Sequence, residues 1–238
     1  MTANILEVRR LHSGYGVREV ISDVSFDVPK GSIAAVVGPN GHGKTTLLWT
    51  ISGLVKPRAG SIQFDGLDIT GYSPDRIARL GLAHAPQGDL LFARMTIRDN
   101  LLMGGFRLSS QAEVKQRCEY VFELFPKLAQ RQHQLTSSLS GGERRMVGLG
   151  RALMAGASLL MVDEPSLGLA PIVIDQIYEA LVELKKQGLS IILVEENPER
   201  VSDLADQMFV VDDGSIVMSG PPQDILNKST ILDAYFGN

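Results

Sequence analysis

The sequence predicts an α/β fold in which helices cover a parallel sheet. Three observations support this. Residues 5–28 show strand patterns, and beyond them apolar strands alternate with helical segments along most of the chain. From about residue 96 to 155 the apolar spacing is three or four, and the stretch between about 88 and 152 indicates a helical insertion into the sheet. The 238 residues, 44% hydrophobic and 21% charged, are sufficient for a large core and exclude a disordered or collagen-like chain.

The N-terminal elements follow from alternation and turn residues. ILEVRRL (5–11) and VISDVSFDV (20–28) have strand patterns, and Pro-Lys-Gly at 29–31 ends the second. The apolar run IAAVV (33–37), a glycine-rich turn and the helical pattern KTTLLWTISGL (44–54) come next. The order is therefore strand, loop, helix.

The remaining elements continue the alternation on both sides of the helical insertion. Before it we expect a strand at 61–66, a helix after Pro74 and a strand at 81–87. After it we expect, in order, a strand at 158–163, a helix at 171–187, a strand at 189–195, a helix near Arg200 and strands at 207–214 and 215–220.

Charge and cysteine content narrow the class of protein. The net charge of −4 gives a nucleic-acid partner no support. The single cysteine, Cys118, lies in an amphipathic pattern typical of a packed free thiol, which fits a reducing cytosolic compartment. The apolar runs are far shorter than the ~20 residues that span a bilayer, so any membrane part is expected on another chain.

The strongest motif is GPNGHGKT (38–45), which matches G-x-x-x-x-G-K-[ST] between a strand and a helix. Glycines let successive backbone N–H groups point at nucleotide phosphates, and the helix N-terminus adds positive potential. Lys44 would reach the β- and γ-phosphates, and the Thr45 hydroxyl would bind Mg²⁺. We interpret His42 as a tolerated side chain pointing to solvent.

Two further motifs carry polar groups at places where α/β proteins bind ligands. LLMVDEP (159–165) reads as a buried strand ending in two carboxylates, of which Asp163 would hold the metal shell and Glu164 would polarise water. LSGGE (139–143) precedes a helix. Ser140 and Glu143 form an ordinary capping-box pattern, and the two glycines add exposed N–H groups that suit a second phosphate.

The phosphate loop, LSGGE and LLMVDEP follow one another in this order along the chain and resemble the ATP-binding cassette (ABC) ATPases, and the resemblance spans nearly the whole chain. Other phosphate-loop families share the phosphate loop and the strand that ends in carboxylates, but not LSGGE. The resemblance implies one nucleotide-binding domain over residues 1–238. It would have a RecA-like core, an N-terminal antiparallel β part and a helical subdomain inserted at roughly 88–152. It also implies two cassettes associated head to tail, each ATP lying between one phosphate loop and the other subunit's LSGGE.

The resemblance assigns expected roles by position. Glu164, Lys44 and Gln87 would be catalytic, and Thr45, Gln87 and Asp163 would bind Mg²⁺. Tyr15 would stack on adenine, although an unremarkable strand-end tyrosine is its alternative. The residues expected to bind ATP are Tyr15, Gly38, Asn40, Gly41, Gly43, Lys44, Thr45, Thr46, Ser140, Gly141 and Gly142.

Two positions depart from the general family pattern. Ala170 stands where the loop after DEP commonly ends in aspartate, and Glu196 stands where a switch histidine is usual. An ionised carboxylate cannot donate a hydrogen bond to the γ-phosphate, and two unit charges ~4 Å apart repel by about 4 kcal/mol at an effective dielectric near 20. We therefore predict that Glu196 turns away from the phosphate, or shares a water with Glu164, and is not the base. DEPSLGLAP, ELFPKL and the tail AYFG resemble ATP-binding subunits of branched-chain amino acid importers (LivF type).

This resemblance implies an ATP-hydrolysing motor on the cytoplasmic face of the membrane. Its partners would be transmembrane permease subunits, a second cassette (the same chain or a related one) and, indirectly, a periplasmic or extracellular solute-binding protein. Two alternatives remain: the motor of a urea or short-amide importer, and a soluble ABC ATPase without a transporter.

Overall fold

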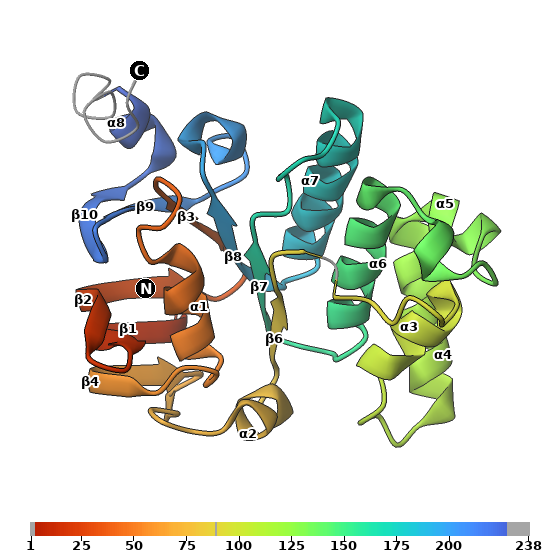
Figure 1. Cartoon of the computed structure of the whole chain (residues 1–238), viewed down its shortest axis with the longest axis horizontal. Helices are drawn as coiled ribbons and strands as arrows, with labels where there is room; N and C mark the ends of the chain where they lie inside the picture. Colours follow the sequence, from red (N-terminus) through yellow and green to blue (C-terminus); the bar gives the residue numbers. More distant parts are fainter. Residues whose placement is uncertain (1–2, 89, 228–238) are drawn as a thin grey trace.

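The computed structural model describes residues 3–88 and 90–227, and in this part of the chain the larger sheet has six strands (Figure 1). Their order is β10-β9-β3-β8-β7-β6. All neighbours run parallel except β10, which pairs antiparallel with β9. The predicted parallel sheet is confirmed, with one antiparallel strand at its edge. The strands are β3 (Ile33–Val37), β6 (Leu82–Ala85), β7 (Leu159–Asp163), β8 (Ser190–Glu195), β9 (Gln207–Asp212) and β10 (Ser215–Gly220).

The smaller sheet is the antiparallel N-terminal part that the sequence predicts. Its order is β2-β1-β4-β5. The strands are β1 (Asn4–Tyr15), β2 (Arg18–Pro29), β4 (Pro57–Phe64) and β5 (Leu67–Asp68). Thus β4 begins earlier than the pattern at 61–66 indicated.

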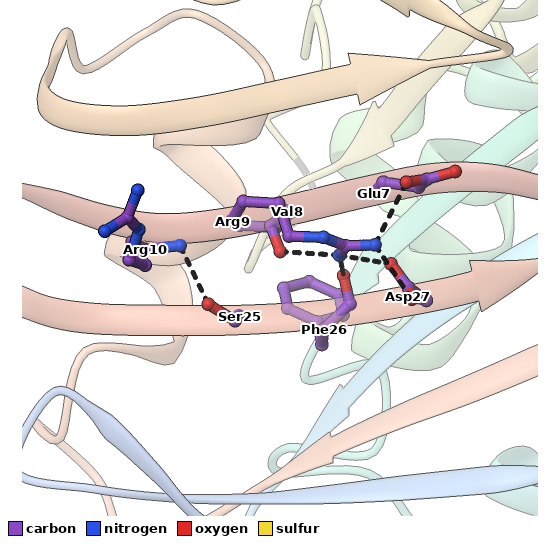
Figure 2. Close-up of polar contacts among 7 residues, drawn as sticks. All are labelled: Glu7, Val8, Arg9, Arg10, Ser25, Phe26 and Asp27. Atoms are coloured by element: carbon purple, nitrogen blue, oxygen red, sulfur yellow. Dashed lines mark hydrogen bonds and ion pairs between the residues drawn. The ribbon is translucent and has the colours of Figure 1, made fainter.

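Polar side chains join β1 to β2 on the exposed face (Figure 2). The Arg9 guanidinium donates to both carboxylate oxygens of Asp27 and, at 3.0 Å, to Glu7 Oε2. Next to it the ladder is irregular: Arg10 has a φ of +43°, and its N–H donates to Ser25 Oγ at 2.8 Å. The serine hydroxyl satisfies an amide that the irregular pairing leaves without a strand partner.

The helices lie on the two faces of the larger sheet. Residues of α1 pack with the small sheet on one face, whereas α3, α4, α6 and α7 contribute to the core on the other. The helices are α1 (Lys44–Ile51), α2 (Pro74–Arg79), α3 (Ile97–Gly104), α4 (Gln111–Leu124), α5 (Pro126–Gln130), α6 (Gly141–Leu153), α7 (Pro171–Lys186) and α8 (Pro222–Leu226), with 3-10 turns η1 (Thr136–Ser138) and η2 (Pro198–Val201). The expected helix near Arg200 is therefore only a 3-10 turn.

The strands of the larger sheet read as continuous apolar runs because both faces are buried. In β3, Ile33, Ala35 and Val37 pack with the helical side, and Ala34 and Val36 pack toward α1 and the small sheet. All five are fully buried.

Four helices, α3 to α6, lie in the chain between β6 and β7 and form the right-hand group in Figure 1. The chain therefore leaves the sheet after Ala85, builds this group, and returns at Leu159. The tail AYFG falls outside the described residues.

Candidate active site

The glycine-rich loop lies between the end of β3 and the start of α1. Gly43 caps α1 with a φ of +101°, and an added Cβ would lie 2.9 Å from Ile21 Cδ1. At Gly38 an added Cβ would lie 2.1 Å from the carbonyl oxygen of Val211. Side chains are thus excluded where the loop passes the sheet. Gly41, with a φ of +84°, and Asn40 are exposed at the loop surface.

The Lys44 ammonium is held inside this loop. Its Nζ donates to Gly38 O at 2.8 Å and to Pro39 O at 3.0 Å, and it lies 3.4 Å from Glu164 Oε1. Lys44 is only 3% exposed. A buried ammonium surrounded by acceptors is suited to exchange them for phosphate oxygens.

Glu164 connects three parts of the site. Its Oε2 accepts a hydrogen bond of 2.8 Å from Gln87 Nε2, and its backbone N–H donates to Val194 O at 3.0 Å. Its φ is +44°, an unfavourable conformation for a residue with a side chain. Such strain persists only where the surroundings enforce it, and it is common at active sites.

Asp163, the last residue of β7, is fully buried, and neither carboxylate oxygen has a hydrogen-bond partner among the described residues. Burial raises the pKa of Asp163 to about 6, although the Thr45 hydroxyl and the Lys44 ammonium act in the opposite direction. Two orphaned carboxylate oxygens beside a hydroxyl are hard oxygen donors of the kind that Mg²⁺ prefers. The residues present therefore fit this ion.

Tyr15 and Thr46 border the loop on the side of the small sheet. Tyr15 is 46% exposed, and its hydroxyl lies 3.4 Å from Thr46 Oγ1. An exposed aromatic ring beside the phosphate loop is available for stacking on a planar base.

The LSGGE segment does not join this cluster within one chain. Ser140 and Glu143 form the predicted capping box at the start of α6, with bonds of 3.3 Å and 2.9 Å. Figure 1 shows α6 and α1 on opposite sides of β6 and β7. At Gly142 an added Cβ would lie 2.5 Å from Val173 Cγ1, so this glycine also permits close packing on α7.

The structure corrects the interpretation of His42. Its ring is only partly exposed, and Nδ1 lies 2.8 Å from Asp212 Oδ1 at the end of β9. The Gly214 N–H donates to the His42 carbonyl at 3.1 Å. His42 therefore ties the phosphate loop to the turn between β9 and β10.

Sequence reasoning missed Glu195, next to the switch position. Glu195 is 2% exposed, and it accepts hydrogen bonds from Ser166 N–H, Ser166 Oγ and Tyr178 Oη at 3.1, 2.7 and 2.9 Å. Burial, and then the charge of Glu195, raise the pKa of Tyr178. Its neighbour Glu196 is exposed. The available signal was a carboxylate at the end of an apolar strand, which is the same pattern that identified Asp163.

Ala170 is the N-cap of α7 and supplies no side-chain cap. Pro171 follows at the first helical position, where a missing N–H is harmless.

An apolar groove of about 630 Å³ opens beside the loop that carries Gln87. Exposed apolar side chains from several elements line it, including Leu54, Leu90, Phe92, Met103 and Phe106. The groove therefore borders both the helical group and the cluster around Glu164.

The comparisons with known proteins identify the family and the fold of the chain. Residues 21–167 match the family model described as ABC transporter. The chain belongs to the ABC transporter family. Its ABC ATP-binding fold is also that of solved cassettes. A nucleotide-free ATP-binding cassette from an ABC transporter aligns with a TM-score of 0.88 and 27% identity, covering 99% of this chain and 100% of the other. The ADP conformation of the cassette MJ1267 aligns at 0.87 and 27%, covering both chains completely.

Named relatives of this ABC protein are ATP-binding proteins of transport systems. It is 40% identical to the high-affinity branched-chain amino acid transport ATP-binding protein BraG of Pseudomonas aeruginosa, over 98% of this chain and 100% of BraG. A probable branched-chain amino acid transport ATP-binding protein, LivF of Archaeoglobus fulgidus, is 35% identical, over 93% and 94%. The lipopolysaccharide export ATP-binding protein LptB of Haemophilus influenzae is 33% identical, over 98% of both chains.

These findings place the chain among the ATP-hydrolysing motor subunits of ABC transporters. It is an ATPase, and cassettes of this family bind ATP or ADP. ATP-binding subunits of this family dimerise and work with membrane permease components. None of the helices in the described ranges is long and apolar enough to cross a membrane.

Proposed function

We propose that this chain drives an importer of branched-chain or other hydrophobic amino acids. The observation that carries the proposal is the 40% identity with BraG over its entire length. Lipopolysaccharide export is a second candidate, because LptB is 33% identical over nearly the same span. A urea or short-amide importer and a soluble ABC ATPase remain the alternatives from the motifs.

For the chemistry, we propose that the phosphate loop and Lys44 neutralise the phosphates of ATP. The γ-phosphate would take the place of the loop carbonyls and of Glu164 around the Lys44 ammonium. Glu164, freed from Lys44 and still bonded to Gln87, would then accept the proton of the attacking water. The loop is shaped by Gly38, Gly41 and Gly43. The remaining contacts to ATP would come from Asn40, Thr45 and Thr46, and Tyr15 would stack on the adenine base.

Asp163, Thr45 and Gln87 would hold Mg²⁺, which when bound neutralises charge on the β- and γ-phosphates. The orphaned oxygens of Asp163 support this assignment.

The second half of the site would come from another cassette. Ser140, Gly141 and Gly142 begin α6, away from the phosphate loop of their own chain (Figure 1). Gly141 has only one atom, Leu169 Cδ2 at 3.8 Å, near an added Cβ, so its backbone is open to a ligand. We propose that these N–H groups close over the γ-phosphate of a facing subunit, identical or related.

The apolar groove would receive a cytoplasmic segment of a transmembrane permease subunit. Exposed Leu90, Phe92 and Phe106 make this surface unfavourable in water unless it is covered. We propose that the helical region, residues 88–152, acts as an inserted subdomain that carries this surface. The chain would then sit on the cytoplasmic face of the membrane, with a solute-binding protein acting indirectly from the other side and no nucleic-acid partner.

Reconstitution tests the proposal. The chain would be purified with the membrane proteins that it captures from detergent-solubilised source membranes, and the complex placed in liposomes with its solute-binding protein. We expect ATP hydrolysis to rise with leucine or isoleucine, and the complex containing the Lys44→Ala variant to stay inactive. Stimulation by urea alone would contradict the amino acid assignment and favour a urea importer. Co-purification with lipopolysaccharide-handling proteins would contradict it and favour lipopolysaccharide export.

A further inference from the structure

Arg145, in the second turn of α6, binds both loops that carry candidate catalytic side chains. Its Nη1 donates to Pro86 O at 3.1 Å and to Gly88 O at 2.6 Å, the carbonyls on either side of Gln87. Its Nη2 donates to Glu164 O at 3.0 Å. One guanidinium thus fixes the backbone at Gln87 and at Glu164, whose side chains bond each other at 2.8 Å.

The position of this side chain matters as much as its bonds. Arg145 lines the apolar groove together with Leu90 and Phe92. Its helix begins at the capping box of Ser140. A displacement of α6 by a molecule bound in the groove would therefore move the guanidinium, and with it the carbonyls of both loops.

The planar, charged guanidinium of Arg145 is well suited to holding two loops in a fixed relation. Hydrogen bonds from a guanidinium are about twice as strong as neutral ones, and its planar donors hold two acceptors in a fixed relation. The positive φ of Glu164 needs support from its surroundings, and the bond to its carbonyl supplies part of it. Misplacement of a catalytic group by ~1 Å can cost on the order of 100-fold in rate.

We propose that Arg145 is a positioning residue that couples occupancy of the groove to the placement of Gln87 and Glu164 for hydrolysis. The coupling rests on the proposed function, because the occupant is the cytoplasmic segment of a membrane partner. The effect on unstimulated hydrolysis does not depend on that partner.

The test compares Arg145→Gln and Arg145→Lys with wild type, alone and in the complex with the captured membrane subunits. Neither substitute can hold both loops, since glutamine has one short amide and lysine one point-like ammonium. The control is Arg117→Gln, which removes a guanidinium that, among the described residues, bonds within its own helix, to Glu113 of α4 at 2.7 Å, far along the chain from both loops. Measured quantities are kcat, KM for ATP, the unfolding midpoint and the ratio of stimulated to basal hydrolysis.

We expect Arg145→Gln to lower basal kcat about ten- to a hundredfold with KM within about twofold, and to bring the stimulation ratio close to one while the complex still assembles. Arg145→Lys should fall between it and wild type, and Arg117→Gln should match wild type.

The proposal is overturned if both Arg145 variants are stimulated as strongly as wild type, or if KM for ATP rises in proportion to the fall in kcat. It is also overturned if their complexes fail to assemble. If Arg145→Gln does not fold, the lysine variant decides. If wild type is not stimulated by its membrane partner, the proposed function fails, whereas the kcat and KM of the isolated variants still decide the role of Arg145 in hydrolysis.

Discussion

The Lys44 ammonium lies 3.4 Å from Glu164 Oε1, and these side chains are 3% and 7% exposed. The proposed phosphate ligand and the proposed base therefore neutralise each other in this structure. Breaking a buried ion pair by removing one partner leaves an uncompensated charge. ATP would compete for Lys44 with the negative charge of Glu164, so nucleotide binding and release of the carboxylate are linked.

Lys44→Ala should remove most of the affinity for ATP, because the charge and its hydrogen bonds to phosphate are lost together. Fluorescent ATP titration measures this loss. The buried carboxylate of Glu164 should also be left unpaired, so the unfolding midpoint without nucleotide should fall. Unchanged titration curves would remove Lys44 from the phosphate site.

Glu164→Gln should keep ATP binding and slow turnover by about two to four decades, since an amide of the same shape cannot accept the proton. The same change should favour an ATP-bound dimer in size-exclusion chromatography. Turnover within about twofold of wild type would assign the base to another residue.

Sequence alone was sufficient for the elements with strong local signals. The loop at 38–45 is conspicuous because glycines and a helix start occur at a fixed spacing, and the apolar runs of β3 and β7 identify a doubly covered sheet. It was insufficient where a role depends on distant contacts. Arg145 reads as a surface arginine in a helix, and only the fold brings it to Glu164 O.

Mg²⁺ removal tests the assignment of Asp163. Chelation of Mg²⁺ should abolish hydrolysis. Asp163→Asn should be active only at a much higher Mg²⁺ concentration than wild type requires, because an amide oxygen carries no charge. Without nucleotide, Asp163→Asn should unfold at a higher temperature than wild type, since it relieves a buried carboxylate that lacks hydrogen bonds. A lower unfolding midpoint together with wild-type Mg²⁺ dependence would argue for a purely structural aspartate.

His84 should make the protein sensitive to mild acid. Burial lowers its pKa from 6.5 to about 4, and Nε2 has no hydrogen-bond partner in the described residues. Between pH 6.5 and pH 4 the unfolded chain binds a proton at His84 more readily than the folded protein does. This contribution to stability is therefore retained above pH 6.5 and lost as the pH falls toward 4. The loss is at most about 3 kcal/mol. Urea denaturation at several pH values should show a weaker dependence for His84→Gln; parallel curves would contradict this account.

The same substitution should destabilise the protein strongly at Glu195 and hardly at all at the adjacent Glu196. Glu195→Ala leaves the Ser166 hydroxyl and N–H and the Tyr178 hydroxyl without their acceptor in a buried place. An unsatisfied buried group costs about 1–3 kcal/mol, so we expect a loss of at least about 2 kcal/mol in the free energy of unfolding.

Glu196→Ala should change the free energy of unfolding by less than about 0.5 kcal/mol, because the side chain is exposed. It should also retain far more hydrolysis than Glu164→Gln when both are assayed with the membrane partner. Glu195→Gln keeps an acceptor oxygen for Tyr178 and Ser166 N–H, so its stability should lie between those of wild type and Glu195→Ala. Denaturation and ATPase assays on the three variants separate the roles. If Glu196→Ala is as inactive as Glu164→Gln while its dimer still forms, Glu196 belongs to the catalytic set despite its exposure, and the nucleotide-bound dimer must bring it to the γ-phosphate.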